Sequence, residues 1–163
     1  MTKGEPSVYD GDISSVLISE QEISDKVTEL ANKVAADYPA DGGNDLVLIT
    51  VLKGAVMFMT DLARALPVPV QLEFMAVSSY GSSTSSSGVV RILKDLDRDI
   101  ADRDVIIVED IIDSGRTLSY LVELLQQRGP ASIEICALLT KPERAEVDIH
   151  CRYIGFEIPN RFV

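Results

Sequence analysis

A short polar turn between an expected strand and an expected helix carries residues suited to binding an anion. Residues 105–108 form an apolar run typical of a buried strand, and apolar residues recur at helical spacing over 118–125. The sequence Ser114-Gly115-Arg116-Thr117 joins the two. The first N–H groups of a helix lack partners within it and lie at the positive end of its dipole, so this turn suits a phosphate monoester. Taken alone, however, Ser114 or Thr117 favours a simple helix cap.

Three acidic residues next to this turn favour a binding site over a simple helix cap. Glu109 and Asp110 precede it, and Asp113 stands one residue before Ser114. Two adjacent carboxylates at the end of an apolar strand repel each other, and a fold tolerates them where they accept hydrogen bonds from hydroxyls or lie near a cation. A ribose 5-phosphate held on the Gly115 backbone would meet both demands and leave Asp113 facing the group at ribose C1. Each acid alone fits a solvated strand end or a helix cap; the combination favours a ribose-phosphate site.

Alternating strands and helices would place this turn at the edge of a parallel sheet. A capping box of Ser19 and Glu22 begins the first helix, which Pro39 ends. The segments expected after it are a strand at 46–51, a helix at 54–66, strands at 70–77, 89–93 and 105–108, a helix ended by Gly129-Pro130, a strand at 132–139 and an extended segment at 147–158. This order predicts an α/β fold with a mostly parallel sheet flanked by helices, in which ligands bind beyond the carboxyl ends of the strands.

The composition restricts the classes of partner. The chain has 163 residues, the length of one domain, and its 15 Lys and Arg against 26 Asp and Glu give a net charge of −11. Nucleic acid and anionic membrane surfaces are therefore disfavoured as partners. Two cysteines without CxxC spacing, Cys136 and Cys151, fit a reducing compartment, and the sequence shows no signal peptide or apolar run of membrane-spanning length. We therefore expect a cytoplasmic protein that acts on small molecules.

The remaining sequence adds one candidate segment and excludes several kinds of site. Residues 78–88 are almost entirely Ser and Gly, which predicts a mobile loop, either a disordered hairpin tip or a lid over the site. The motifs GxxxxGK[ST] and GxGxxG are absent from the sequence, which argues against a P-loop and a dinucleotide fold. His150 is the only histidine, so neither a Ser–His–Asp triad nor a zinc site is supported.

Several segments together resemble one enzyme family. VIIVEDIIDSGRTL (105–118) resembles the phosphoribosyl-diphosphate motif of the type I phosphoribosyltransferases, and its form EDIIDSGRT is similar to that of the hypoxanthine-guanine phosphoribosyltransferases. The other segments that match, in the same order along the chain, are Leu52-Lys53-Gly54, Ser79-Tyr80-Gly81, Leu139-Thr140-Lys141-Pro142 and GFEIPNRFV at 155–163. The resemblance implies a single domain over 1–163 with the type I phosphoribosyltransferase fold and a small hood formed by its N- and C-terminal segments.

The resemblance also implies roles for the matching residues. Asp113 would be the catalytic residue that handles the proton on purine N7. The residues implied to hold phosphoribosyl diphosphate are Lys53, Gly54, Glu109, Asp110, Asp113, Ser114, Gly115, Arg116 and Thr117. Among them, Lys53 and Gly54 would contact the diphosphate. The Leu52–Lys53 peptide bond that precedes them is often cis in relatives. Glu109 and Asp110 would bind the ribose hydroxyls and magnesium.

The purine site and the active-site loop are implied in the same way. Lys141 would donate to the purine 6-oxygen, Phe162 would stack on the base, and the Val163 backbone would read its edge. Without the resemblance, Lys141 fits a surface lysine and Phe162 a core residue. Ser79 and Tyr80 would begin the flexible loop at 78–88, which would close over the reaction and exclude water.

The implied reaction is purine salvage. Phosphoribosyl would pass from phosphoribosyl diphosphate to hypoxanthine or guanine, giving IMP or GMP and diphosphate, with Mg²⁺ and in a homodimer or homotetramer. A relative that prefers xanthine, a nucleotide-sensing regulator of the same fold and a catalytically silent scaffold are the alternatives. The acidic charge and Asp113 argue against the regulator. Relatives usually continue beyond the position of Val163 with an acidic magnesium ligand and an arginine, and this tail is expected to be absent.

Overall fold

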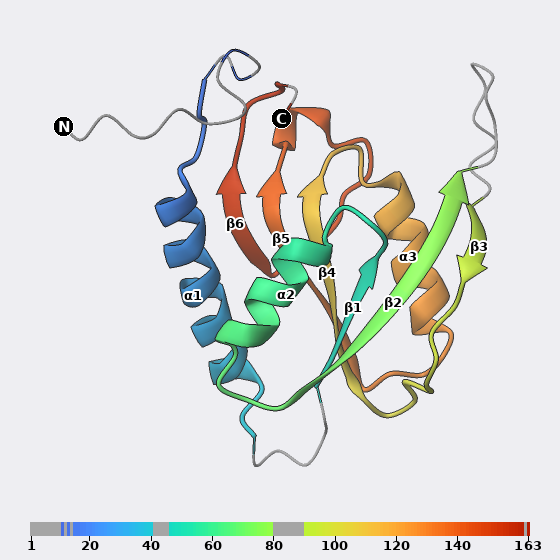
Figure 1. Cartoon of the computed structure of the whole chain (residues 1–163). Coiled ribbons are helices and arrows are strands. Elements are labelled where there is room, and N and C mark those ends of the chain that lie inside the picture. Colours follow the sequence, from blue (N-terminus) through green and yellow to red (C-terminus); the bar gives the residue numbers. More distant parts are fainter. Residues whose placement is uncertain (1–10, 12, 14, 41–45, 80–89, 162) are drawn as a thin grey trace.

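Six strands form one twisted sheet in the computed structural model, which describes residues 11, 13, 15–40, 46–79, 90–161 and 163. The strands are β1 (Leu46–Val51), β2 (Val70–Ser79), β3 (Val90–Lys94), β4 (Asp104–Ile112), β5 (Ser132–Thr140) and β6 (Tyr153–Glu157). They lie in the order β3-β2-β1-β4-β5-β6, and only the β2–β3 pair is antiparallel within the described residues (Figure 1). The predicted mostly parallel sheet is confirmed.

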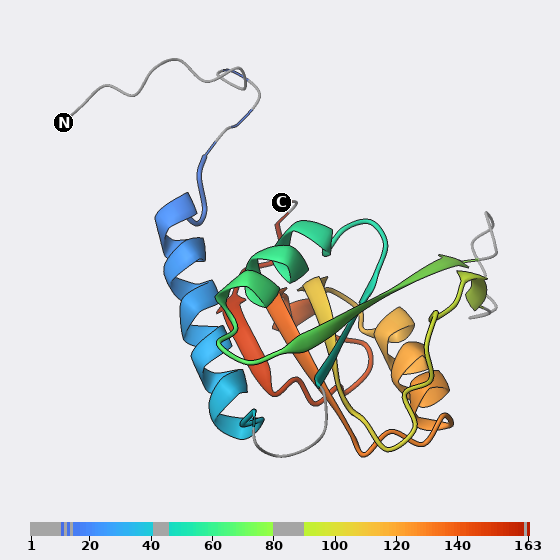
Figure 2. The ribbon, with the colours of Figure 1, turned by 60° about the horizontal axis from the view of Figure 1, so that its bottom comes forward.

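Helices cover both faces of this sheet. They are α1 (Glu20–Asp37), α2 (Val56–Ala65), α3 (Arg116–Gln126) and the 3-10 turn η1 (Pro142–Arg144). One core cluster packs α1 and α2 against strand residues such as Leu48 and Ile106, and the other packs α3 against their sequence neighbours Ile49 and Ile107 (Figures 1 and 2). Because side chains of a strand alternate between its faces, these continuous apolar runs serve two cores at once.

The first helix begins as its sequence predicts. Ser19 N–H donates to Glu22 Oε2 at 2.7 Å and Glu22 N–H donates to Ser19 Oγ at 3.3 Å, so the capping box is formed. At its other end, Tyr153 OH donates to Asp37 Oδ2 at 2.6 Å. This hydrogen bond ties α1 to the edge strand β6.

Two sequence-based boundaries are wrong. The strand expected at 105–108 continues to Ile112, because β4 stays paired with β5 through Ile111↔Leu139 and Ile112↔Thr140. Glu109 and Asp110 therefore lie within β4 and not in the turn after it. The extended segment expected at 147–158 is a strand only over Tyr153–Glu157, where it pairs with β5.

The chain segments around the sheet bear on the remaining expectations. The described residues before α1 and after β6 both lie beyond the carboxyl ends of the strands, on the side where a hood is expected (Figure 1). Most of the expected loop at 78–88 lies outside the described residues, which include only its first two positions, at the end of β2. In the part of the chain that is described, no helix has both the length and the apolar character needed to span a bilayer.

Candidate functional site

A cavity of about 230 Å³ lies where β1 and β4 reach their carboxyl ends. It is lined by Val51, Gly54, Ala55, Glu109, Asp110, Ile111, Ile112, Asp113, Ser114, Gly115, Thr117 and Leu118. Seven of the nine residues expected at a phosphoribosyl diphosphate therefore share one wall. Lys53 and Arg116 are exposed and do not line the cavity.

The amino-terminal end of α3 forms one side of this cavity. Gly115 is its N-cap residue, with φ +82° in the left-handed region, and Ser114 Oγ accepts a long hydrogen bond from Arg116 N–H at 3.5 Å. Ser114 therefore contributes a weak cap, as the simpler alternative predicts, whereas Thr117 makes no such bond within the described residues. A Cβ at Gly115 would lie 2.8 Å from Ile149 Cδ1, the end of a side chain that can move, so it is the left-handed backbone conformation that favours glycine here. The next N–H groups of α3, those of Thr117 and Leu118, remain available for an anion.

The loop after β1 approaches the acidic pair closely. The Leu52–Lys53 peptide bond is cis, as the resemblance implies. A Cβ added to Gly54 would stand 2.5 Å from Asp110 Oδ2, so a larger residue here would displace the Asp110 carboxylate. The other oxygen, Asp110 Oδ1, accepts a hydrogen bond from Ile111 N–H at 2.8 Å. The Asp110 carboxylate therefore lies next to the loop that carries Lys53 and is hydrogen-bonded to the backbone of its own strand.

Glu109 is the acid whose environment differs most from water. Its burial, reinforced by the neighbouring charge of Asp110, raises the pKa of Glu109 from 4.5 to about 7. A bound cation would offset both the free-energy cost of burying the Glu109 charge and its repulsion by Asp110. The Glu109–Asp110 pair therefore has the chemistry of a site for a hard divalent cation, whose preferred ligands are oxygens.

The raised pKa of Glu109 predicts a pH-dependent stability. Between pH 4.5 and about 7, the unfolded chain releases the Glu109 proton while the folded protein keeps it. The free energy of unfolding of the metal-free protein should therefore fall as pH rises through this window, by at most about 3 kcal/mol. Glu109→Gln should remove the fall and be more stable than the wild type at pH 8, as measured by urea unfolding between pH 4 and 8.

The matched control for this substitution is Glu123→Gln, because Glu123 is exposed on α3. It should keep the pH dependence of the wild type. A Glu109→Gln protein whose stability follows the wild-type curve at every pH would contradict the assignment of the raised pKa to Glu109.

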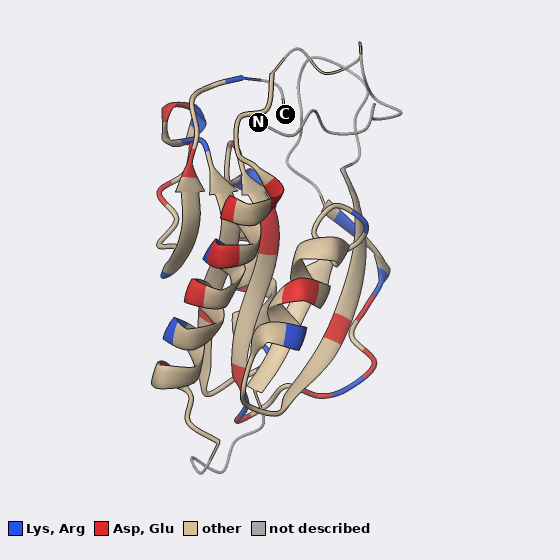
Figure 3. Ribbon diagram, turned by 60° about the vertical axis from the view of Figure 1, so that its left-hand side comes forward, with Lys and Arg blue, Asp and Glu red and all other residues tan. Residues whose placement is uncertain are grey.

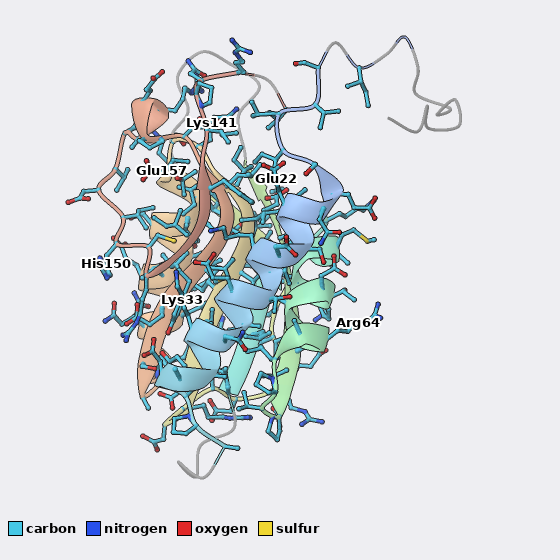
Figure 4. The ribbon with its side chains drawn as sticks, turned by 90° about the vertical axis from the view of Figure 1, so that its left-hand side faces the viewer. Glu22, Lys33, Arg64, Lys141, His150 and Glu157 are labelled. Carbon is cyan, nitrogen blue, oxygen red and sulfur yellow. The ribbon has the colours of Figure 1, made fainter. Side chains whose placement is uncertain are left out.

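A second cavity of about 680 Å³ lies beside the first, under the segment 141–151. Ile112 and Asp113 line both cavities. Lys141, largely buried, lines only the second, and its N–H donates to Ile112 O at 3.0 Å. Lys141 and Glu157 lie at the carboxyl end of the sheet, whereas His150 lies farther down the side (Figure 4). We call residues 114–117, which lead into the first turn of α3, the cradle. Asp113 thus stands between this cradle and the wall that carries Lys141.

Other expected residues are not brought to these walls. Val163 is 59% exposed and lines neither cavity. Tyr80 and Phe162 lie outside the described residues, and so does the side chain of Ser79, the last residue of β2.

Two residues at the site are absent from the sequence-based set. Arg144 donates from Nε to Asp113 Oδ1 at 2.8 Å, and Ile149 fills the space above Gly115. Pro142, directly after Lys141, is a typical first residue of a helical turn. That signal could have indicated that the chain turns back toward the site at Arg144.

The geometry agrees with what comparison with known proteins shows. Residues 17–163 match the phosphoribosyl transferase domain family. The chain belongs to the phosphoribosyltransferases. This phosphoribosyltransferase is 60% identical to the hypoxanthine-guanine phosphoribosyltransferase of Mycobacterium tuberculosis, over 96% of this chain and 79% of that protein.

Two further relatives agree with this assignment. A hypoxanthine phosphoribosyltransferase of Salmonella typhimurium is 50% identical over 91% of this chain and 83% of the relative. The crystal structure of a hypoxanthine phosphoribosyltransferase from Staphylococcus aureus superimposes with a TM-score of 0.89 at 42% identity, covering 96% of this chain and 83% of that one. The predicted family and the type I phosphoribosyltransferase fold are confirmed.

Proposed function

We propose that this phosphoribosyltransferase transfers phosphoribosyl from phosphoribosyl diphosphate to hypoxanthine or guanine, in purine salvage. The observation that carries the proposal is the position of Asp113 on the shared wall of two cavities, one with an anion cradle and one with Lys141. The names of the relatives, which are hypoxanthine or hypoxanthine-guanine phosphoribosyltransferases, support the same reaction.

In the first cavity, the amino-terminal end of α3 would hold the 5-phosphate. Residues 113–117, with Arg116 adding its charge from outside the wall, would surround that phosphate. Glu109 and Asp110 would accept hydrogen bonds from the ribose hydroxyls and hold Mg²⁺. Lys53 and Gly54 would contact the diphosphate next to Asp110. Bound Mg²⁺ would stabilise charge on the leaving diphosphate.

The chain's own residues would handle charge and protons during transfer. As the bond from ribose C1 to diphosphate breaks and the bond from C1 to purine N9 forms, positive charge builds on the ribose, and the acids of β4 stabilise it. The proton leaving purine N7 would pass to the Asp113 carboxylate. Lys141 would donate to the 6-oxygen, while Phe162 and the Val163 backbone would contact the base.

The partners, cellular location and assembly of the enzyme are also part of the proposal. The net charge of −11, and the excess of acidic over basic residues on α1 (Figure 3), support small molecules and not nucleic acid as partners. We propose a cytoplasmic enzyme, in keeping with the absence of a membrane-spanning helix among the described residues. A homodimer or homotetramer is the proposed assembly.

A direct assay tests the function. The protein is incubated with Mg²⁺, phosphoribosyl diphosphate and, in separate reactions, hypoxanthine, guanine, xanthine or adenine, and the monophosphate product is measured. We expect IMP and GMP. Product from xanthine alone would favour a xanthine-preferring enzyme, and no product from any base would contradict the proposed reaction.

A further inference from the structure

Residues 142–147, which follow Lys141, are hydrogen-bonded and ion-paired to the cradle at residues 114–117. The N–H groups of Glu146 and Val147 donate to Ser114 O at 3.1 and 3.3 Å. The Glu146 side chain forms an ion pair with Arg116. The wall that carries Lys141 and the turn that carries Asp113 are therefore held in one arrangement by main-chain and side-chain contacts.

Arg144 makes the contact of this segment that reaches the reacting group itself. The turn η1, closed by Arg144 N–H donating to Lys141 O at 2.9 Å, directs the chain back toward β4. Arg144 Nε then donates to Asp113 Oδ1 at 2.8 Å. Asp113 Oδ2 accepts no hydrogen bond from the residues that the structure describes. One oxygen of the carboxylate is held, the other has no hydrogen-bond donor among the described residues, and Asp113 lines both cavities.

We propose that Arg144 is a positioning residue that holds Asp113 by one oxygen and leaves the other free to take the purine N7 proton. The inference rests on the proposed function of Asp113 and adds a residue to it. The charge-assisted attraction between the guanidinium N–H and Oδ1 restricts rotation of the carboxylate. The same attraction raises the pKa of Arg144.

The other charged groups near Asp113 determine what the loss of Arg144 would do. Lys141, Glu146, Asp148, His150 and Glu157 line the second cavity with it, and Glu109 and Asp110 line the first. Acids predominate in this set, and Asp113 forms its ion pair with Arg144. Without that cation, Asp113 would lose its salt-bridge partner among the described residues.

The test compares Arg144→Met, Arg144→Lys and a control. Arg144→Met should lower kcat by about tenfold and leave the KM for phosphoribosyl diphosphate unchanged. Arg144→Lys keeps the charge and should restore most of the lost kcat. Arg128→Met removes an arginine whose Nη1 lies 2.8 Å from Asp95 Oδ1, away from both cavities, and should change none of these quantities.

A second measurement keeps this inference separate from the proposed reaction. Carbon-13 NMR of aspartate-labelled protein, with Asp113→Asn to assign the signal, gives the chemical shift of the Asp113 carboxyl carbon without turnover. Arg144→Met should change that chemical shift, because the hydrogen-bond donor at Oδ1 is lost. An unchanged chemical shift, or an Arg144→Met enzyme with the kcat of the wild type, would overturn the role of Arg144. If the wild type makes no nucleotide but the chemical shift changes, the proposed reaction fails and the contact stands.

Discussion

Asp113→Asn is expected to lower kcat by about 10²- to 10⁴-fold, the range in which a general acid or base contributes to catalysis. Asparagine keeps the shape of the side chain, and its Oδ1 can still accept the hydrogen bond that Arg144 Nε donates at 2.8 Å. It cannot take up the proton from purine N7. Because the 5-phosphate would be held mainly by the backbone of α3, the affinity for phosphoribosyl diphosphate should stay within about threefold of wild type.

The measurement combines steady-state kinetics with calorimetric titration of phosphoribosyl diphosphate and Mg²⁺. Asp61→Asn is the matched control, because Asp61 lies on α2 at the groove facing α1, outside both cavities. It should leave kcat and affinity unchanged. An Asp113→Asn protein that loses affinity in proportion to kcat would show that Asp113 binds the substrate and does not carry the proton.

The local patterns of the sequence predicted most of the architecture. Capping at Ser19, the continuous apolar runs and the breaks at Pro39 and Gly129-Pro130 are determined by neighbouring residues, and the elements they indicate are present. The start of α3 was predicted for a similar reason. A helix start with a left-handed glycine as its N-cap is a property of a few consecutive residues around Gly115.

The features that the sequence could not predict depend on contacts between distant segments. The end of β4 is set by the length of β5 beside it. Glu109 and Asp110, whose polar side chains are typical of the end of a strand, therefore remain within β4. The need for glycine at position 54 comes from Asp110, and the hydrogen bond of Asp113 comes from Arg144. In both cases the partners are more than 30 residues apart, and no local periodicity encodes their meeting.

Gly115→Val is expected to weaken binding of phosphoribosyl diphosphate by about 100-fold or more. The added side chain would not enter the phosphate site, because a Cβ at this position points toward Ile149 Cδ1 at 2.8 Å and Val147 O at 3.5 Å. Instead, valine disfavours the φ of +82°, and the first turn of α3 must move. Loss of two charge-assisted hydrogen bonds to phosphate, at about 1.5 kcal/mol each, corresponds to about 100-fold in affinity.

Gly129→Val separates the backbone effect from the site. Gly129 also has a positive φ, +69°, and a Cβ there would meet nothing within 4 Å. It should cost about 1–2 kcal/mol of stability, as a side chain in the left-handed region does, and leave the affinity for phosphoribosyl diphosphate unchanged. Calorimetric titration of both variants, each shown to be folded by circular dichroism, decides the matter. Wild-type affinity in a folded Gly115→Val protein would mean that the phosphate is held elsewhere, because a main-chain cradle cannot keep its geometry once its N-cap residue leaves the left-handed conformation.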